Sequence, residues 1–172
     1  YAFSFNEPRN GYCSFFDYNT LEWVMCAEDV LYMWKNGELW KQDNETRCNF
    51  FGIQYDAEIQ VPFNDNLYQK KSWQSIIELG NTTWECPEIY SNVNTYTGQR
   101  QETSAGEREF TTYEGMATAS VKRDRFSRGG KTNGSFMKGN YLIVTLKKEN
   151  ASALTYLDSV TAGFVDSPLN RI

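Results

Sequence analysis

Apolar and polar residues alternate along much of this chain, most clearly between Asn49 and Val61. Every second position from Phe51 to Val61 is apolar, and the positions between them hold glycine or polar residues. A strand with one buried and one exposed face has this period of two, whereas a helix would scatter the same residues around its circumference. The pattern predicts one long strand in a half-exposed antiparallel sheet, and we expect the fold to be organised around it.

The N-terminal part contains shorter segments of the same kind, separated by turn residues, at Tyr1–Phe5, Tyr12–Phe16 and Leu21–Cys26. Two further apolar segments, Val30–Trp34 and Leu39–Trp40, flank the dipeptide Asn36-Gly37. Both residues of that dipeptide accept a positive φ, which favours a two-residue hairpin turn. The first half of the chain is therefore predicted to consist of short paired strands.

The C-terminal part predicts three longer strands, at Phe110–Lys122, Tyr141–Leu146 and Leu154–Val165. Between Leu67 and Leu79 the apolar residues form an incomplete helical stripe, so we expect at most one short helix, near residues 69–79. The segment from Ser91 to Ala105 has few apolar residues and is predicted to be an exposed connection.

Two prolines add expectations about strand ends. Pro87 is expected to confine the segment Trp84–Tyr90 to a sheet edge or a loop, because proline lacks an N–H donor. Pro62 is expected to end the long strand described first.

Together these segments predict one all-β domain over residues 1–172. The expected architecture is an antiparallel β-sandwich, jelly-roll-like in its strand pattern, or a barrel. No internal repeat or linker composition divides the chain.

Composition narrows the classes of partner. Aromatic residues make up 16% of the chain, which is typical of sheet proteins and of surfaces that bind sugars. The net charge of -5 argues against nucleic acid as a partner. No apolar run approaches the roughly 20 residues that a membrane-spanning helix needs. The chain begins at Tyr1 rather than Met, and we expect that a signal peptide has been removed.

Two features predict an extracellular glycoprotein. Four cysteines without C-x-x-C spacing predict two disulfides of undetermined connectivity, with Cys13 and Cys26 expected on paired strands; the set is Cys13, Cys26, Cys48 and Cys86. Four N-x-S/T sequons lie where turns are expected, and their asparagines are Asn44, Asn81, Asn133 and Asn150. We therefore expect secretion.

Two groups of residues are candidates for ligand binding. Trp34 and Trp40 flank one hairpin and could stack against sugar rings, whereas Trp23 is expected to pack on a disulfide at Cys26. A basic, glycine-containing segment could recruit an acidic glycan or an acidic neighbouring copy; its cations are Lys122, Arg123, Arg125, Arg128 and Lys131.

Glu107 and Glu109 are the candidates for catalysis. Two residues apart on a strand, their carboxyl groups would project from one face at about 5–5.5 Å, the separation used by retaining glycosidases. Solvated glutamates at a loop edge are the simpler interpretation.

Several segments resemble laminarinase-type glucanases with the concanavalin-like jelly roll. The resemblance rests on Tyr96-Thr97-Gly98, Phe110–Gly115, Ala117–Lys122 and Thr155–Val160. It implies a jelly-roll shape. The E-x-D-x-x-E catalytic motif of that family is absent, and a short basic segment stands in its place, so the resemblance does not extend to hydrolysis.

The absence of histidine excludes Ser-His-Asp and Cys-His nucleophilic sites. We expect no cofactor and no metal. The function predicted from sequence is a secreted, non-catalytic glycoprotein that binds glycan or associates with neighbouring copies as an extracellular structural component. The alternatives are a carboxylate-based glycoside hydrolase and a calycin-type carrier whose closed barrel holds a small ligand.

Overall fold

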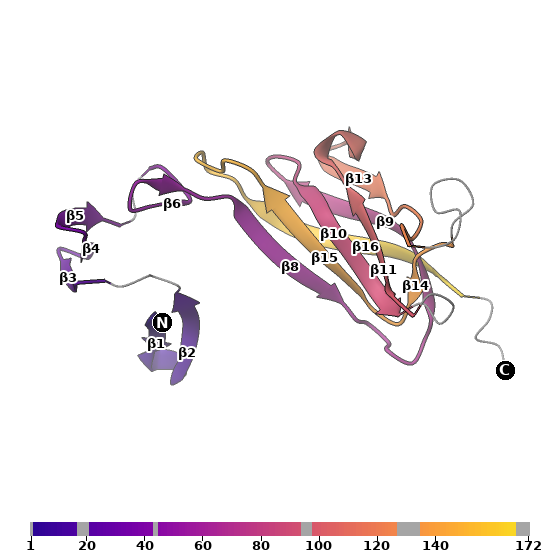
Figure 1. Ribbon diagram of the computed structural model, residues 1–172, viewed down its shortest axis with the longest axis horizontal. Coiled ribbons are helices and arrows are strands. Elements are labelled where there is room, and N and C mark those ends of the chain that lie inside the picture. The colour runs from indigo at the N-terminus through magenta and orange to yellow at the C-terminus, as the bar shows by residue number, and fades with distance from the viewer. Residues whose placement is uncertain (1, 17–20, 43–44, 94–97, 127–134, 168–172) are drawn as a thin grey trace. The chain divides into compact units, whose positions relative to one another are not determined.

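The computed structural model describes residues 2–16, 21–42, 45–93, 98–126 and 135–167. Contacts within the chain group it into two compact units, Tyr1–Ile53 (unit 1) and Gln54–Ile172 (unit 2), where the sequence predicted a single domain. The described residues form antiparallel strands and two short 3-10 turns (Figure 1). The all-β prediction is confirmed.

Unit 1 is built from short hairpins. Its strands are β1 (Ala2–Asn6), β2 (Gly11–Phe16), β3 (Trp23–Ala27), β4 (Val30–Lys35), β5 (Glu38–Lys41), β6 (Asn49–Phe50) and β7 (Ile53–Gln54), the last crossing the unit boundary. Strand β1 pairs with β2, β3–β4–β5 form a three-stranded sheet, and β6 pairs with β7.

The turns of unit 1 follow the expected chemistry. Asn36 and Gly37 adopt φ values of 55° and 77° between β4 and β5, which confirms the hairpin. Between β1 and β2, the 3-10 turn η1 (Glu7–Arg9) is capped by the Asn6 side chain, which accepts a hydrogen bond from the Arg9 N–H at 3.0 Å. Local sequence therefore determines the pairing of neighbouring strands in this unit.

The predicted central strand from Asn49 to Val61 is wrong as a single element. Phe51 and Gly52 adopt φ values of 52° and 76° and form a tight turn between β6 and β7. The strand β8 (Ala57–Phe63) then begins in unit 2 and contains Pro62. Alternation continues across both elements because each is half-exposed, so the hydrophobic pattern does not reveal the turn.

Unit 2 contains the hydrophobic core. Besides β8, its strands are β9 (Lys71–Gly80), β10 (Glu85–Val93), β11 (Arg100–Ala105), β12 (Thr111–Tyr113), β13 (Met116–Ser120), β14 (Lys138–Gly139), β15 (Leu142–Lys148) and β16 (Leu157–Asp166). A second 3-10 turn, η2 (Glu107–Glu109), precedes β12.

These strands form two sheets that enclose the core. One sheet has the order β11-β10-β15-β8, and in the other β9 pairs with β16 on one side and with β13 and β14 on the other. Buried side chains from both sheets meet between them, among them Trp73, Ile89 and Val144. The arrangement is an open sandwich and not the closed barrel that we also considered (Figure 1).

The short helix predicted near residues 69–79 is wrong, because this segment forms β9, the best-connected strand of its sheet. Opposite Ser75 and Trp73, strand β16 places the consecutive residues Gly163 and Phe164, so Gln74 is an extra residue in β9. This bulge brings Trp73 and Ile76 to the same buried side, three positions apart. A spacing of three imitates the helical stripe.

The segment around Pro87 forms β10, which lies between β11 and β15, so the expected edge position is also wrong. The register shifts between Cys86 and Ile89 in the pairing with β11 and between Glu85 and Glu88 in the pairing with β15, so Pro87 lies within both irregularities. Proline is accommodated there because the bulge removes the need for its missing N–H.

The predicted exposed connection from Ser91 to Ala105 is wrong in part. Its ends belong to β10 and β11, and alternate residues of β11 are buried: Gln101, Thr103 and Ala105. Residues 94–97 lie outside the described part. Polar side chains can be buried here because they are hydrogen-bonded. The Gln101 side-chain amide donates to the Lys138 carbonyl at 2.5 Å and accepts from the Lys138 N–H at 2.9 Å.

The three C-terminal strand predictions hold with changed bounds. The segment Phe110–Lys122 is divided by a turn at Glu114 and Gly115, which have φ values of 50° and 80°, into β12 and β13. Ala117 and Ala119, two positions apart on β13, are both buried. Strands β15 and β16 confirm the other two predictions.

Candidate binding surface

The three-stranded sheet of unit 1 presents aromatic side chains to solvent. In its register Trp23 lies opposite Trp34, and Trp34 lies opposite Leu39. Directly opposed residues of antiparallel strands project from the same face, so these three side chains form one row across the sheet. Met25, Tyr32 and Lys41 form the next row of the same face. We call this surface the indole face; it consists of Trp23, Met25, Tyr32, Trp34, Leu39 and Lys41.

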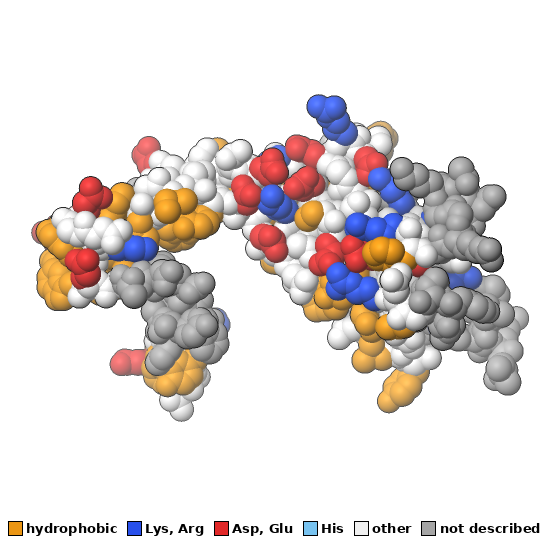
Figure 2. Space-filling view, in the orientation of Figure 1, with side chains coloured by type: hydrophobic (Ala, Val, Ile, Leu, Met, Phe, Trp, Pro, Cys, Tyr) orange, Lys and Arg blue, Asp and Glu red, His pale blue; other side chains and the backbone are white. Residues whose placement is uncertain are grey.

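The row of large side chains is well exposed. Trp23, Trp34 and Leu39 keep 55%, 38% and 53% of their surface accessible. Figure 2 shows hydrophobic side chains at the surface over these strands. Two indoles and a leucine in adjacent exposed positions form an apolar patch of the kind that marks an interaction site.

The opposite face of the same sheet is packed at its centre, around Met33 and Trp40, while Val24 and Leu31 on that face stay 45% and 37% exposed. Met33 is 2% exposed, and Trp40 lies next to it in the register. The Trp40 ring contacts the Phe51 ring edge-to-face at 5.9 Å, and the Lys35 ammonium lies 4.3 Å from the Phe51 ring centre. Trp40 therefore has a packing role.

The structure separates the two tryptophans predicted to bind a ligand together. Trp34 belongs to the indole face and Trp40 to the packed face. Trp34 lies opposite Leu39, whereas Trp40 lies opposite Met33, and neighbouring pairs project from opposite faces of the sheet. Trp34 instead pairs with Trp23, which we expected to be buried on a disulfide. Alternation along the sequence could have placed Trp23 and Met25 on one face of the strand and Val24 on the other. It could not have shown which of the two faces is packed in the folded chain.

The basic segment from Lys122 onwards is engaged in local contacts where the structure describes it. Lys122 forms an ion pair with Glu109, and Arg125 pairs with Glu102 at 2.8 Å. The Arg123 guanidinium lies 4.5 Å from the ring centre of Phe136. Arg128 and Lys131 lie outside the described residues, and each of the three described cations contacts a different residue.

Glu107 and Glu109 lie in the 3-10 turn η2 and not on a strand, which corrects the arrangement expected for them. Glu107 accepts a hydrogen bond from the Lys148 ammonium at 2.9 Å. The bond from Lys122, together with the Gly106 N–H, lowers the pKa of Glu109. A carboxyl group with a lowered pKa is poorly suited to donate a proton near neutral pH.

A different glutamate has the most unusual environment in unit 2. Glu78, in β9, is 1% exposed, and its carboxylate accepts a hydrogen bond from the Trp84 N–H at 3.0 Å. The Cys86 thiol lies 3.8 Å from its other oxygen. Burial raises the pKa of Glu78 to about 7, an effect that the Trp84 N–H only partly offsets. Its partners are backbone and core groups, and it does not line the cleft formed by Pro62–Asp65, Trp73 and β16 residues.

The cysteines that the structure describes are free thiols. Cys26 is exposed, Cys48 is partly buried and Cys86 is buried in the core of unit 2, where burial raises the pKa of its thiol. The expected pairing of strands is also wrong, because Cys13 lies on β2, which pairs with β1, whereas Cys26 lies on β3, which pairs with β4. The two predicted disulfides are therefore not seen among the described side chains.

Two of the four sequons can be located. Asn81 and Asn150 are exposed in turns, as predicted. The Asn81 side chain donates to the Leu154 carbonyl at 2.8 Å and accepts from the Tyr156 N–H at 3.0 Å. Asn44 and Asn133 lie outside the described residues. The Asn150 side chain is exposed and accessible to a glycan. At Asn81 the nitrogen that would carry the glycan is the one that donates to the Leu154 carbonyl.

The described residues contain no group of three or more cysteine, aspartate or glutamate side chains arranged to hold a metal ion. Within the same part of the chain, no helix has the length and apolar composition to cross a membrane. No protein-family model matches the sequence, and no curated protein shows significant similarity to it.

Proposed function

We propose that this chain is a non-catalytic assembly component that associates with neighbouring copies through the indole face. The observation that supports the proposal is that unit 1 buries few of its apolar side chains and leaves large ones exposed. Among its described apolar side chains Met33 alone is buried, while Trp23, Trp34 and Leu39 are exposed. Short hairpins without a core are at best marginally stable in water, so a partner surface would supply the missing burial.

The composition of the indole face supports a protein partner. Tryptophan, tyrosine and methionine are enriched at the centres of protein interfaces, and tryptophan and tyrosine dominate the residues that contribute most to binding. A second copy brings an identical face, and two such faces form a closed interface around a two-fold axis. Indoles from the two copies can then pack edge-to-face, the arrangement that aromatic rings prefer.

Light scattering coupled to size-exclusion chromatography tests this proposal. The wild-type chain is expected to show a mass that rises with concentration, and the double variant Trp23→Ser, Trp34→Ser is expected to remain monomeric. Each truncation of a central interface residue costs about 2 kcal/mol or more, roughly thirtyfold in affinity. The control is Tyr68→Ser, since Tyr68 is a fully exposed aromatic residue outside this face. A monomeric wild type at all concentrations would refute the proposal.

A glycan is the second candidate partner, favoured by the pairing of two exposed indoles across β3 and β4. Flat aromatic rings bind the apolar C–H face of a sugar ring. The exposed Glu22 carboxylate, next to Trp23 in the chain, accepts a hydrogen bond from the Asn36 N–H at 3.1 Å. Glycan-array binding by a monomeric wild type, lost in the Trp34→Ser variant, would assign the face to sugar.

We also propose that the protein is secreted and glycosylated, on the basis of the exposed sequons at Asn81 and Asn150. The free thiols do not support this part of the proposal. Intact-mass measurement of protein purified from its natural source, before and after deglycosylation and reduction, tests it. A mass equal to that of the bare polypeptide would refute it.

A further inference from the structure

Unit 2 has a long sheet edge without the usual protection against strand pairing. Strand β16 pairs with β9 on one side, and no other described strand pairs with it. It is ten residues long and contains no lysine, arginine or proline. Natural edge strands are usually short or carry such residues. The extra residue of the bulge at Gly163–Phe164 is Gln74 of β9, so β16 runs unbroken from Ser159 to Asp166.

The edge of the facing sheet differs. Strand β8 is the outer strand there, and it contains Pro62 and the charged Glu58. Proline removes a donor from the edge, so β8 is protected in the usual way, whereas β16 has no proline and its two charged residues, Asp158 and Asp166, lie near its ends. The two edges of the sandwich on this side are therefore not equivalent.

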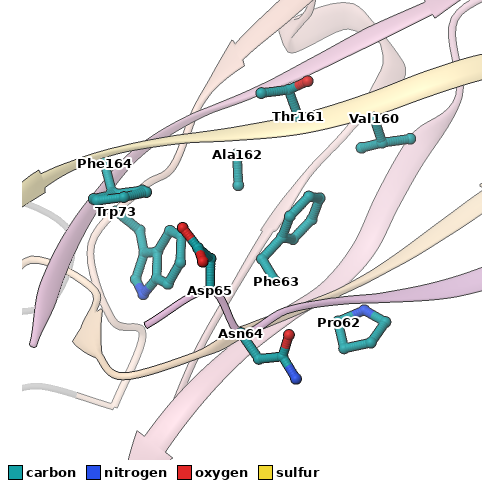
Figure 3. A pocket seen from close by; sticks show the side chains of 9 residues that line it. All are labelled: Pro62, Phe63, Asn64, Asp65, Trp73, Val160, Thr161, Ala162 and Phe164. Carbon is teal, nitrogen blue, oxygen red and sulfur yellow. The ribbon is translucent and has the colours of Figure 1, made fainter. Parts of the chain in front are cut away.

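An open cleft of about 300 Å³ lies between β8 and β16. It is lined mainly by apolar and aromatic side chains, together with three polar ones: Pro62, Phe63, Asn64, Asp65, Trp73, Val160, Thr161, Ala162 and Phe164. In Figure 3, Ala162 points from β16 toward Phe63 and Asp65. Trp73 and Phe164 meet edge-to-face at 5.4 Å and form one end of the lining. The cleft has the size and character to accept an apolar side chain.

The charges on β16 itself and in the cleft lining are negative, and the exposed Lys70 lies beside the C-terminal end of the strand, where its carbonyl accepts a hydrogen bond from the Ser167 N–H at 3.0 Å. Asp158 and Asp166 lie at the two ends of β16, and Asp65 is the one charged residue of the lining. Lys71, which pairs with Asp166 in the register, is fully buried. Its ammonium donates to the carbonyls of Asn66 and Asn140 at 3.0 and 3.2 Å, so it is not presented to a ligand at the edge.

We propose that β16 and the adjoining cleft bind an extended segment of a partner protein by strand addition. The segment pairs with the outer edge of β16 through main-chain hydrogen bonds and places an apolar side chain in the cleft. Lysine or arginine residues at its ends pair with Asp158 and Asp166. A second copy of β16 fits less well, because pairing two copies brings aspartates together at the ends of the ladder.

Fluorescence anisotropy with the full chain tests this proposal. The probe is a labelled peptide of alternating valine and threonine with lysine at both ends, and its counterpart has glutamate at both ends. The lysine peptide is expected to bind about tenfold more tightly at low salt, with the difference narrowing as salt is added. Equal binding of both peptides, or binding of neither, would overturn the proposal.

Two matched variants locate the binding site. Thr161→Lys adds a protective charge on β16 and is expected to weaken binding by about tenfold or more. Thr118→Lys makes the same change at an exposed position of β13, which has a neighbour on each side, and is expected to leave binding unchanged. Hydrogen exchange of β16 amides should slow when the peptide binds. Unchanged exchange there, or a dimer that Thr161→Lys dissociates, would count against a foreign strand.

Discussion

Glu78 is a carboxyl group in a place where a neutral group is preferred. It is buried on β9, and its carboxyl group contacts Trp84 and Cys86. The Lys148 ammonium lowers its pKa and the Glu107 carboxylate raises it. Burial dominates, and it raises the pKa of Glu78 from its ordinary value of 4.5 to about 7. The protonation state of one side chain is therefore linked to the stability of unit 2.

The sign of this linkage follows from the direction of the shift. The folded state holds the proton more tightly than the unfolded state, so the contribution of Glu78 to stability is complete below about pH 4.5 and is lost as the pH rises through about 7. At pH 8 the loss is on the order of 3 kcal/mol. We expect Glu78→Gln to raise the free energy of unfolding at pH 8 by a similar amount and to have little effect at pH 4.5.

Urea unfolding at the two pH values measures this change. Glu109→Gln is the control, because the pKa of Glu109 is lowered and its contribution is instead lost as the pH falls. A Glu78→Gln variant that is equally destabilised at both pH values would show that the Trp84 hydrogen bond outweighs the burial of charge.

At the scale of elements, β9 shows how close approach of two strands restricts a residue. Gly80 ends β9 opposite Leu157, and a Cβ at this position would overlap with the backbone oxygen of Tyr156. The backbone cannot move as a flexible side chain could, since Asn81 holds the same segment through bonds to Leu154 and Tyr156. The start of β16 is thereby fixed against the end of β9.

We expect Gly80→Ala to lower the free energy of unfolding by about 1–3 kcal/mol, the usual cost of overpacking. The comparison is Gly106→Ala, because a Cβ on Gly106 meets nothing within 4 Å and its φ of -76° suits alanine. Thermal or urea unfolding of both variants measures the difference. Equal stability of the two would mean that the β9–β16 junction yields to the added methyl group.

At the scale of the whole molecule, the two units differ in how they are stabilised. Unit 2 has a buried cluster that draws side chains from both sheets, including Ile76, Leu142 and Leu146. Unit 1 has Met33 and the contacts around Trp40. The free energy of local opening depends on buried apolar contacts, so we expect it to be much larger in unit 2.

Native-state hydrogen exchange measures this contrast. Amides of β9, β10 and β15 are expected to exchange slowest, and amides of β3–β5 quickly at low protein concentration. Protection of β3–β5 should rise with concentration if copies associate through the indole face, because binding stabilises the associated form by mass action. Strong protection of unit 1 at every concentration would show that it is stable by itself.

Strand character and local turns could be predicted from the sequence, because both depend on neighbouring residues. Asn36-Gly37 determines its hairpin through its own φ preferences, and Ala117 and Ala119 show their buried face by alternation. The turn at Phe51-Gly52 was missed because both flanking strands are half-exposed. The helix expected near 69–79 was wrong because the bulge at Gln74 depends on pairing with β16, which is distant in sequence.

The sequence by itself determined the strand class, the hairpins and the types of side chain available for binding. Tertiary structure decided which sheet each strand joins, that Trp34 is exposed beside Trp23 while Trp40 is packed, and that Glu107 and Glu109 have separate ion-pair partners. The physical reason is range. Turn preferences and side-chain alternation act over a few residues, whereas burial, strand neighbours and charge partners depend on segments that meet only in the folded chain.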